Sequence, residues 1–543
     1  FAKIAESLRQ YRRAELRDFE DALGESPLDQ LYVDSLPNDT VLNTVLTNNT
    51  TFLLGRKGTG KSTVFAKAQG ELRKQKGLIS IYVDVKSLYE LMGAAQPAVI
   101  KTEKTQISEP ALQSHLLRKH FLGAVIGDLI RELEVVCKTL NVWERWTGKK
   151  KYENVMDKLK SIADTVKHAR LSEEEIPVLQ NISAKTKAAV SQKKKNSVSA
   201  KIKGSWFSDK TGVDTELTAD ALEEALADDE MYQEYSDAIL RSFPFNELLK
   251  EIQLLLLGAG AKRLVVFFDD FSEISFINQR LFVDVILAPL NNASDESIKL
   301  KVAGYPGRVY YGKIDPGKID TLCLDFSILY KSQDVQSAEA AAIAYTTRLL
   351  ERRFIAFGEE FSQYFDLSAA KIDEYMRLIF ETTFNVPRLM GYILHYCYLD
   401  RISQNQLITP ASIKLASQKY YETVVTSYFT QLNRYALEPF ERKLDRRNQE
   451  ILLHLLITES KDVRRRILAG TVGGSYFEGL SNPPASHFSI EPKKEKVLAS
   501  LEMNFLVTKY HDMRNKDGKD VSIYALLYGL CEAERIPWGY PRG

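Results

Sequence analysis

One glycine-rich segment constrains the fold of this chain more than any other feature: Gly-Arg-Lys-Gly-Thr-Gly-Lys-Ser at residues 55–62. It follows a short apolar run, Thr51–Leu54, and precedes a helical pattern over Thr63–Lys76. A strand that passes through glycines into a helix presents backbone N–H groups and the positive end of the helix dipole to an anion. The sequence therefore predicts a phosphate-binding loop at the end of a buried strand.

The residue types of this loop suit a nucleoside triphosphate and its magnesium ion. Lys61 would reach the β- and γ-phosphates, and the Ser62 hydroxyl would bind Mg²⁺. The residues expected to hold the nucleotide are Gly55, Gly58, Thr59, Gly60, Lys61, Ser62 and Thr63. Because the guanine-specific Asn-Lys-x-Asp motif is absent from the sequence, we expect ATP as the nucleotide.

A second apolar run, Arg263–Phe268, ends in two carboxylates, Asp269 and Asp270. Open α/β sheets bind ligands at the carboxyl ends of their strands, so Asp269 is placed to hold Mg²⁺ through water. Asp270, or Glu273 three residues later, is the candidate that orients the attacking water. A buried strand with a polar end is the simpler interpretation, but the glycine loop upstream argues against it.

Three further β-rich runs, Leu78–Val85, Leu300–Tyr305 and Thr321–Phe326, are separated by helical segments. This alternation predicts an α/β fold with a mostly parallel sheet and helices on both faces. The gap between the strands Leu78–Val85 and Arg263–Phe268 is too long for a single crossover and predicts a large helical insert.

The C-terminal part has a different pattern. Two predicted helices, Arg446–Ile457 and Lys461–Leu468, precede a third at Pro492–Met503. Two alternating strands then flank an Asp-Gly turn, which is a strong hairpin signal. Three helices followed by a two-stranded wing indicate a winged helix.

We therefore expect five parts along the 543 residues. They are an N-terminal helical segment (1–34), an ATPase core (35–100 and 241–330), a helical insert (101–240), a helical lid (331–435) and a winged-helix domain (436–543).

The insert is divided by its charge. Glu109–Leu140 has apolar residues at helical spacing and should pack on the core. Lys185–Lys210 holds eight lysines, and Thr211–Leu240 holds ten acidic residues and no Lys or Arg. One interpretation is a solvated basic loop followed by acidic helices. The other is a basic finger that touches phosphate backbones or the acidic face of a partner.

The glycine loop, the Asp-Asp-Phe-Ser-Glu run at 269–273 and the helical lid together resemble additional-strand P-loop ATPases, the AAA+ class and its STAND relatives. The lid sequence Asn385–Leu389 resembles their proline-arginine element, which implies that Arg388 faces the γ-phosphate. Val497–Met503, followed by a wing, is similar to the last segment of origin-recognition-type initiator ATPases. The resemblance also implies that Arg308, after the fourth strand, either reports the γ-phosphate or is a solvated surface arginine.

Composition limits the partners. Lys plus Arg is 73 and Asp plus Glu is 72, which excludes a globally basic nucleic-acid coat. DNA contact through the winged helix and the basic insert, or contact with a protein effector, must therefore be local. A homo-oligomer is expected by analogy alone. No apolar run is long enough for a membrane helix, and the four scattered cysteines suit a reducing compartment, so we expect a cytoplasmic protein without membrane partners.

Two function classes remain open. The first is an ATP-hydrolysing switch that couples nucleotide state to DNA or a partner protein, in a bacterial defence or DNA-transaction complex. The second is a nucleotide-binding scaffold with little turnover that recruits an effector through its winged helix and insert.

Overall fold

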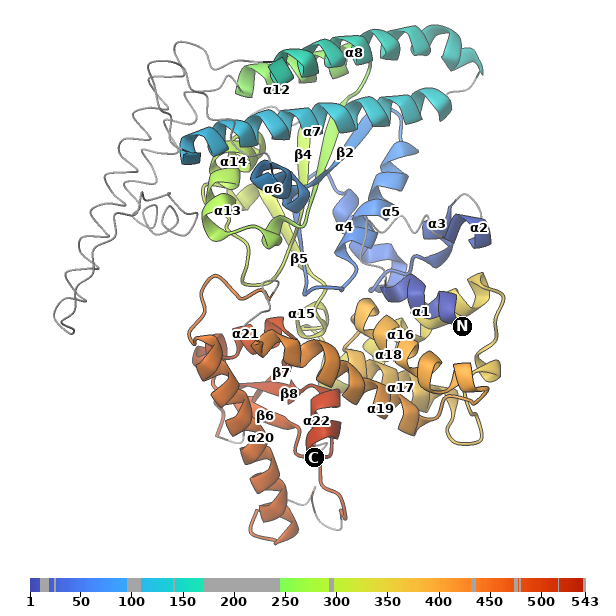
Figure 1. Cartoon of the computed structure of the whole chain (residues 1–543), viewed down its shortest axis with the longest axis vertical. Coiled ribbons are helices and arrows are strands. Elements are labelled where there is room, and N and C mark those ends of the chain that lie inside the picture. The colour runs from blue at the N-terminus through green and yellow to red at the C-terminus, as the bar shows by residue number, and fades with distance from the viewer. Residues whose placement is uncertain are drawn as a thin grey trace, which may run out of the picture.

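Figure 1 shows the computed structural model of the chain, with an α/β core above two further helix-rich parts. The structure describes residues 1–9, 19–23, 26–94, 109–139, 142–168, 245–292, 297–430, 436–472, 477, 480–515 and 517–540. The predicted basic stretch 185–210 and acidic stretch 211–240 lie outside the described residues.

The core contains a five-stranded sheet in which every neighbouring pair is parallel. Its strands, in spatial order, are β2 (Leu78–Asp84), β3 (Arg263–Asp269), β4 (Ile298–Gly304), β1 (Thr50–Leu54) and β5 (Ile319–Cys323). The predicted α/β class with a mostly parallel sheet is confirmed, and every expected strand is present with ends displaced by three residues or fewer. The glycine loop follows β1, and β4 separates β1 from β3.

Helices cover both faces of the sheet. Successive side chains of β3 point to opposite faces, and apolar side chains on each face pack against helices. Phe268 stacks against Phe121, with ring centroids 6.2 Å apart, whereas Phe267 contacts Phe65 on the other face at 5.1 Å. The helices of the Phe268 face are α6 (Val85–Ala94), α7 (Glu109–Thr139), α8 (Val142–His168), α12 (Phe245–Gly258), α13 (Phe276–Phe282) and α14 (Ala288–Asn292). Those of the Phe267 face are α4 (Thr40–Leu46) and α5 (Lys61–Arg73).

Helix α7, the first part of the predicted insert, packs on the core as expected, and a row of its apolar side chains is buried there. It also covers the outer edge of β2: the amide of Tyr82 donates to Asp128 Oδ2 at 2.5 Å. Arg73 Nε of α5 donates to Glu132 Oε2 at 2.8 Å. Polar contacts thus hold α7 against the edge strand β2 and against α5.

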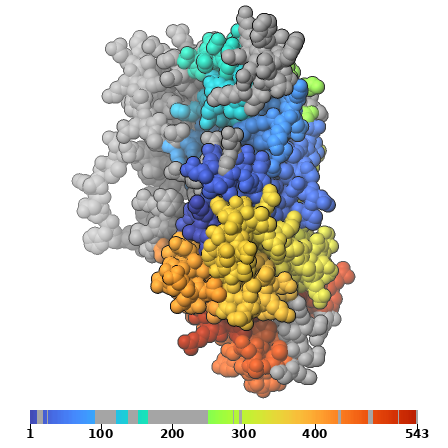
Figure 2. Space-filling model, turned by 90° about the vertical axis from the view of Figure 1, so that its right-hand side faces the viewer, coloured from blue at the N-terminus to red at the C-terminus, as the bar shows by residue number. Residues whose placement is uncertain are grey.

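The lid and the N-terminal segment lie together below the core, and Figure 2 shows the yellow and orange lid against the dark-blue N-terminal segment. Helix α15 (Phe326–Leu329) follows the last strand of the core. The lid helices are α16 (Val335–Ala356), α17 (Ile372–Thr383), α18 (Pro387–Asp400) and α19 (Pro410–Tyr420); the N-terminal helices are α1 (Ala2–Arg9), α2 (Glu20–Leu23) and α3 (Pro27–Leu31). Helix α1 lies directly on α18. A Cβ at Gly391 would stand 2.7 Å from the Arg9 amide nitrogen, so glycine permits this close approach.

The C-terminal unit, residues 436–540, combines helices with a three-stranded antiparallel sheet of order β6-β8-β7. Its elements are α20 (Arg446–Leu468), β6 (His487–Ile490), α21 (Ala499–Met503), β7 (Val507–Arg514), β8 (Asp520–Leu526) and α22 (Tyr528–Glu534). The predicted hairpin is confirmed as β7 and β8. The two helices expected over 446–468 are wrong, because this segment forms one continuous helix. No glycine or proline interrupts it, and the Thr458 hydroxyl donates back to the His454 carbonyl at 2.9 Å.

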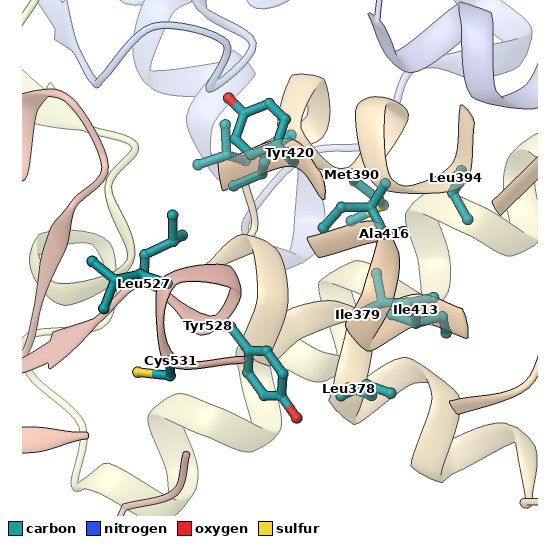
Figure 3. Packing of buried hydrophobic residues seen from close by; sticks show 14 of the residues in the cluster. Leu378, Ile379, Met390, Leu394, Ile413, Ala416, Tyr420, Leu527, Tyr528 and Cys531 are labelled. Atoms are coloured by element: carbon teal, nitrogen blue, oxygen red, sulfur yellow. The ribbon is translucent and has the colours of Figure 1, made fainter. Parts of the chain in front are cut away.

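The lid and the C-terminal unit share one hydrophobic core. Figure 3 shows apolar side chains of the two parts in one cluster: Leu378, Ile379, Met390, Leu394, Ile413, Ala416 and Tyr420 from the lid, with Leu527, Tyr528 and Cys531 from the C-terminal unit. A Cβ at Gly529 of α22 would overlap the Ser417 carbonyl oxygen, so these helices are in backbone contact.

Candidate functional site

The glycine loop has the backbone that its sequence requires. Gly58 and Gly60 have φ of 90° and 95°, a region that side-chain-bearing residues rarely adopt. Gly60 is the N-cap of α5, so the loop leads directly into the positive end of a 13-residue helix. Ser62 and Thr63 occupy the first turn of that helix. The arrangement is suited to an anion.

Lys61 lies buried at the start of α5. Its Nζ donates to the carbonyl oxygens of Gly55 and Arg56, at 2.6 and 3.1 Å, and lies 4.6 Å from the centre of the Tyr305 ring. Burial lowers the pKa of Lys61 to about 8, against the opposing effect of nearby aspartates. An ammonium has three donor hydrogens, so two held by the loop leave one for a ligand oxygen.

The two aspartates at the end of β3 have different surroundings. Asp269 is buried; its Oδ1 accepts the Asp270 amide at 2.9 Å, and its Oδ2 accepts the Tyr82 hydroxyl. Asp270 has a left-handed backbone, with φ of 51°. Burial, followed by the negative charges of Asp269, Glu273 and Asp84, raises the pKa of Asp270 to about 7. A carboxyl group with this pKa exchanges a proton near neutral pH.

One cleft of about 760 Å³ brings the loop and the acidic strand end together. The sequence-predicted residues that line it are Gly58, Thr59, Gly60, Lys61, Ser62, Thr63, Asp269, Asp270 and Arg388. Gly55 does not line the cleft, but its carbonyl oxygen accepts a hydrogen bond from Lys61 Nζ. Two further predicted residues, Glu273 and Arg308, are not among the lining residues.

Glu273 lies beside the cleft in a network of donors. Lys57 and Lys86 pair with its two carboxylate oxygens at 3.3 and 3.2 Å, and the Tyr305 hydroxyl donates to Oε1 at 2.6 Å. Burial alone would raise the pKa of Glu273, but the two lysines and the tyrosine outweigh it and hold the pKa below its usual value. Glu273 is therefore an ionised partner of the loop residue Lys57.

Arg308 does not occupy the position that the resemblance implies. Its guanidinium donates to the carbonyl oxygens of Ser272, Ile274 and Glu438, at 2.8, 3.2 and 2.5 Å, and lies over the Phe440 ring. The side chain is also buried, so the solvated alternative is wrong as well. Arg308 instead joins the core to the start of the C-terminal unit.

Arg388 comes from the lid and touches the loop. Helix α18 begins at Pro387, as the sequence predicts, after two residues with positive φ, Phe384 and Asn385. The Arg388 amide donates to the Gly58 carbonyl at 3.3 Å, and a Cβ at Gly58 would stand 2.6 Å from Arg388 Cβ. The lid therefore closes one side of the cleft directly over the glycine loop.

Sequence reasoning missed the far end of the cleft, which the N-terminal segment and α16 form; its lining there includes Ser7, Leu8, Leu31, Tyr32, Tyr345, Leu349 and Arg353. The buried Arg353 donates to Ser7 Oγ at 3.1 Å and to the Leu31 carbonyl at 3.2 Å. Burial lowers its pKa to about 10. Tyr82 and Tyr305, which also line the cleft, were missed as well, although Tyr305 directly follows a strand, where site residues are expected.

The residues present suit Mg²⁺ only together with a phosphate ligand. Among the described residues, no group of three or more His, Cys, Asp or Glu side chains could hold a metal by itself. Magnesium sites with nucleotides commonly use one or two protein oxygens, the phosphates and water. Asp269 and the Ser62 hydroxyl, the predicted ligands, match that pattern in chemical type.

Several basic residues of the C-terminal unit that could contact a phosphate backbone are paired with carboxylates. Arg465 and Arg466 both pair with Asp462. Further pairs join Lys494 to Glu491, Lys496 to Glu441 and Arg514 to Asp520. Lys516 lies outside the described residues. The local positive charge available to a phosphate backbone is thereby reduced.

Comparison with known proteins gives no family: no family model matches the chain, and no curated protein matches it. Within the part of the chain that the structure describes, none of the helices combines the length and apolar character that a membrane crossing requires.

Proposed function

We propose that this chain binds Mg²⁺–ATP and hydrolyses it, and that the nucleotide state is passed to the lid and the C-terminal unit. The observation that carries the proposal is the shared cleft, which the glycine loop and both strand-end aspartates line. A glycine loop alone suits any anion. Two carboxylates beside it, the buried Asp269 and the half-buried Asp270, suit an anion that brings a divalent cation.

The roles follow from the contacts. The loop amides and the remaining Lys61 donor would bind the phosphates, while Asp269 and Ser62 would hold the cation. Bound Mg²⁺ would supply charge neutralisation for the phosphate oxygens. Asp270 would accept the proton of the attacking water, since its pKa of about 7 leaves much of it ionised at neutral pH. Arg388, whose backbone meets Gly58, would bring positive charge from the lid.

The strand order supports the resemblance to additional-strand P-loop ATPases. In such a core one extra strand separates the strand of the phosphate loop from the strand of the acidic residues, and here β4 separates β1 from β3. The hairpin of β7 and β8 after α21 similarly supports a winged helix in the C-terminal unit. Both assignments remain part of the proposal.

A slow-turnover scaffold is the second candidate, and Glu273 favours it. Its carboxylate is held by Lys57, Lys86 and Tyr305, which leaves Asp270 as the predicted residue to activate water. An aspartate is one methylene shorter than a glutamate and reaches less far. The paired charges of the C-terminal unit favour a protein partner over DNA in either case.

The test is Mg²⁺–ATP binding and single-turnover hydrolysis by the full chain, the Lys61→Ala variant and a Lys74→Ala control. Lys74 lies just beyond the last turn of α5, pairs with Glu71 and does not line the cleft. We expect Lys61→Ala to lose tight binding and Lys74→Ala to keep it. Equal binding by all three proteins would refute the site assignment. Binding without measurable turnover would favour the scaffold.

A further inference from the structure

The second residue of the glycine loop, Arg56, connects the loop to the C-terminal unit. Its side chain is 3% exposed and does not line the cleft. Nη1 donates to the Glu502 carbonyl at 3.2 Å and to Thr508 Oγ1 at 3.0 Å. Nε donates to Asp325 Oδ1 at 2.9 Å, and Asp325 follows β5 within the core. The loop expected to face the phosphates is thus held from behind by a core residue and by the C-terminal unit.

The backbone of the same residue holds the phosphate-binding lysine. The Arg56 carbonyl accepts Lys61 Nζ at 3.1 Å and Thr59 Oγ1 at 2.9 Å. A displacement of Arg56 would therefore move the acceptor that orients Lys61. The side chain of Arg56 thus contacts the C-terminal unit, while its backbone carbonyl contacts Lys61, which lines the cleft.

The C-terminal unit has a strained turn at this contact. Phe505 has φ of 66°, which is costly for an aromatic residue and persists only where the surroundings enforce it. Its ring lies 4.6 Å from the Arg56 guanidinium carbon. Glu502, which supplies the carbonyl acceptor, also accepts the Lys509 amide through Oε1 at 3.2 Å. These contacts therefore hold the turn around Phe505 in the position in which it contacts Arg56.

We propose that Arg56 is a positioning residue through which docking of the C-terminal unit holds the glycine loop in its phosphate-binding shape. The inference rests on the proposed function, because it concerns the affinity of the same cleft for Mg²⁺–ATP. Asp325 alone would balance the charge of Arg56. The carbonyl, hydroxyl and ring contacts with the C-terminal unit add a link that charge balance does not need.

Such a link is reciprocal. If docking tightens nucleotide binding, the nucleotide must tighten docking by the same factor. Removal of one docking contact should therefore weaken Mg²⁺–ATP binding, although the altered residue lies in the C-terminal unit and does not line the cleft. Because the residues that line the cleft are unchanged, the rate of ATP hydrolysis in the bound complex, kcat, should change little.

The experiment compares Thr508→Val with Thr508→Ser in the full chain. Valine keeps the shape of the buried side chain and loses the acceptor for Arg56, whereas serine keeps the acceptor. We expect the Kd for Mg²⁺–ATP to rise about fivefold or more in Thr508→Val and to stay within about twofold in Thr508→Ser, with kcat unchanged in both. In the unaltered chain, Mg²⁺–ATP should slow hydrogen exchange in residues 499–509.

The outcomes separate the two proposals. If the unaltered chain does not bind Mg²⁺–ATP, the proposed function fails, and this inference fails with it. If the unaltered chain binds but Thr508→Val binds equally well, only the inference fails. Unchanged exchange of residues 499–509 on nucleotide binding also overturns it, and that measurement needs no variant and so does not depend on the folding of one.

Discussion

The contact between the lid and the glycine loop can be isolated by two alanine substitutions that differ in one respect. Gly58 and Gly60 have nearly equal φ, 90° and 95°, so alanine pays a similar backbone penalty at both, about 1–2 kcal/mol. A Cβ at Gly60 would meet nothing within 4 Å. A Cβ at Gly58 would stand 2.6 Å from Arg388 Cβ. That atom is at the root of a helical side chain and cannot move without α18.

The difference between the variants therefore measures the lid contact. Overpacking of this kind costs about 1–3 kcal/mol, so α18 should open about 5- to 150-fold more often in Gly58→Ala than in Gly60→Ala. The assay is native-state hydrogen exchange of residues 384–394 without nucleotide, which reports local opening free energies. Equal protection of this segment in the two variants would refute a lid seated on the loop.

Four further predictions concern the site and its supports. Asp270→Asn should keep Mg²⁺–ATP binding and lose most single-turnover hydrolysis, because the amide cannot accept the proton; unchanged turnover would assign the base elsewhere. The ratio kcat/KM for Mg²⁺–ATP should rise with pH through about 7, because it follows the ionisation of Asp270 in the free protein. Stability follows the opposite trend with pH. Because the pKa of Asp270 is raised from 3.8 to about 7 in the folded state, its contribution to stability is complete below about pH 4 and is lost as the pH rises to about 7, so Asp270→Asn should raise the melting temperature at pH 8 and not at pH 4. Gly391→Val should push α1 off α18, since a Cβ there already meets the Arg9 amide nitrogen at 2.7 Å; proteolysis that releases residues 1–9 no faster than in the unaltered chain would contradict that packing.

The sequence predicted the core well where local rules apply. Glycines between a strand and a helix, carboxylates after an apolar strand and a proline at the start of α18 each have a short-range physical cause, and each was found in the expected place. The sheet followed from alternation of strand and helix patterns. Such signals are contained within about ten residues and do not depend on distant parts of the chain.

The missed features all depend on distant partners. Arg308 looked like a site residue because it follows a strand, yet its acceptors include the Glu438 carbonyl, 130 residues away. Nothing near Arg56 in the sequence indicates Thr508, and the pairing of Lys57 with Glu273 needs the folded sheet. The continuous α20 differs from the prediction for a local reason: residues 458–460, between the two predicted helices, include no glycine or proline that would end a helix.

Helix α7 covers the outer edge of β2, and this has a consequence for shortened versions of the protein. Within the described residues β2 pairs with a strand on one side only, and the Tyr82 amide on its other side is taken by Asp128. Excision of residues 101–240 would strip that cover and leave an unpaired backbone row on a strand rich in β-branched and aromatic residues, ready to recruit a strand from a neighbouring molecule. Helix α7 therefore protects this strand edge, and a chain without the insert should aggregate unless another segment covers the edge.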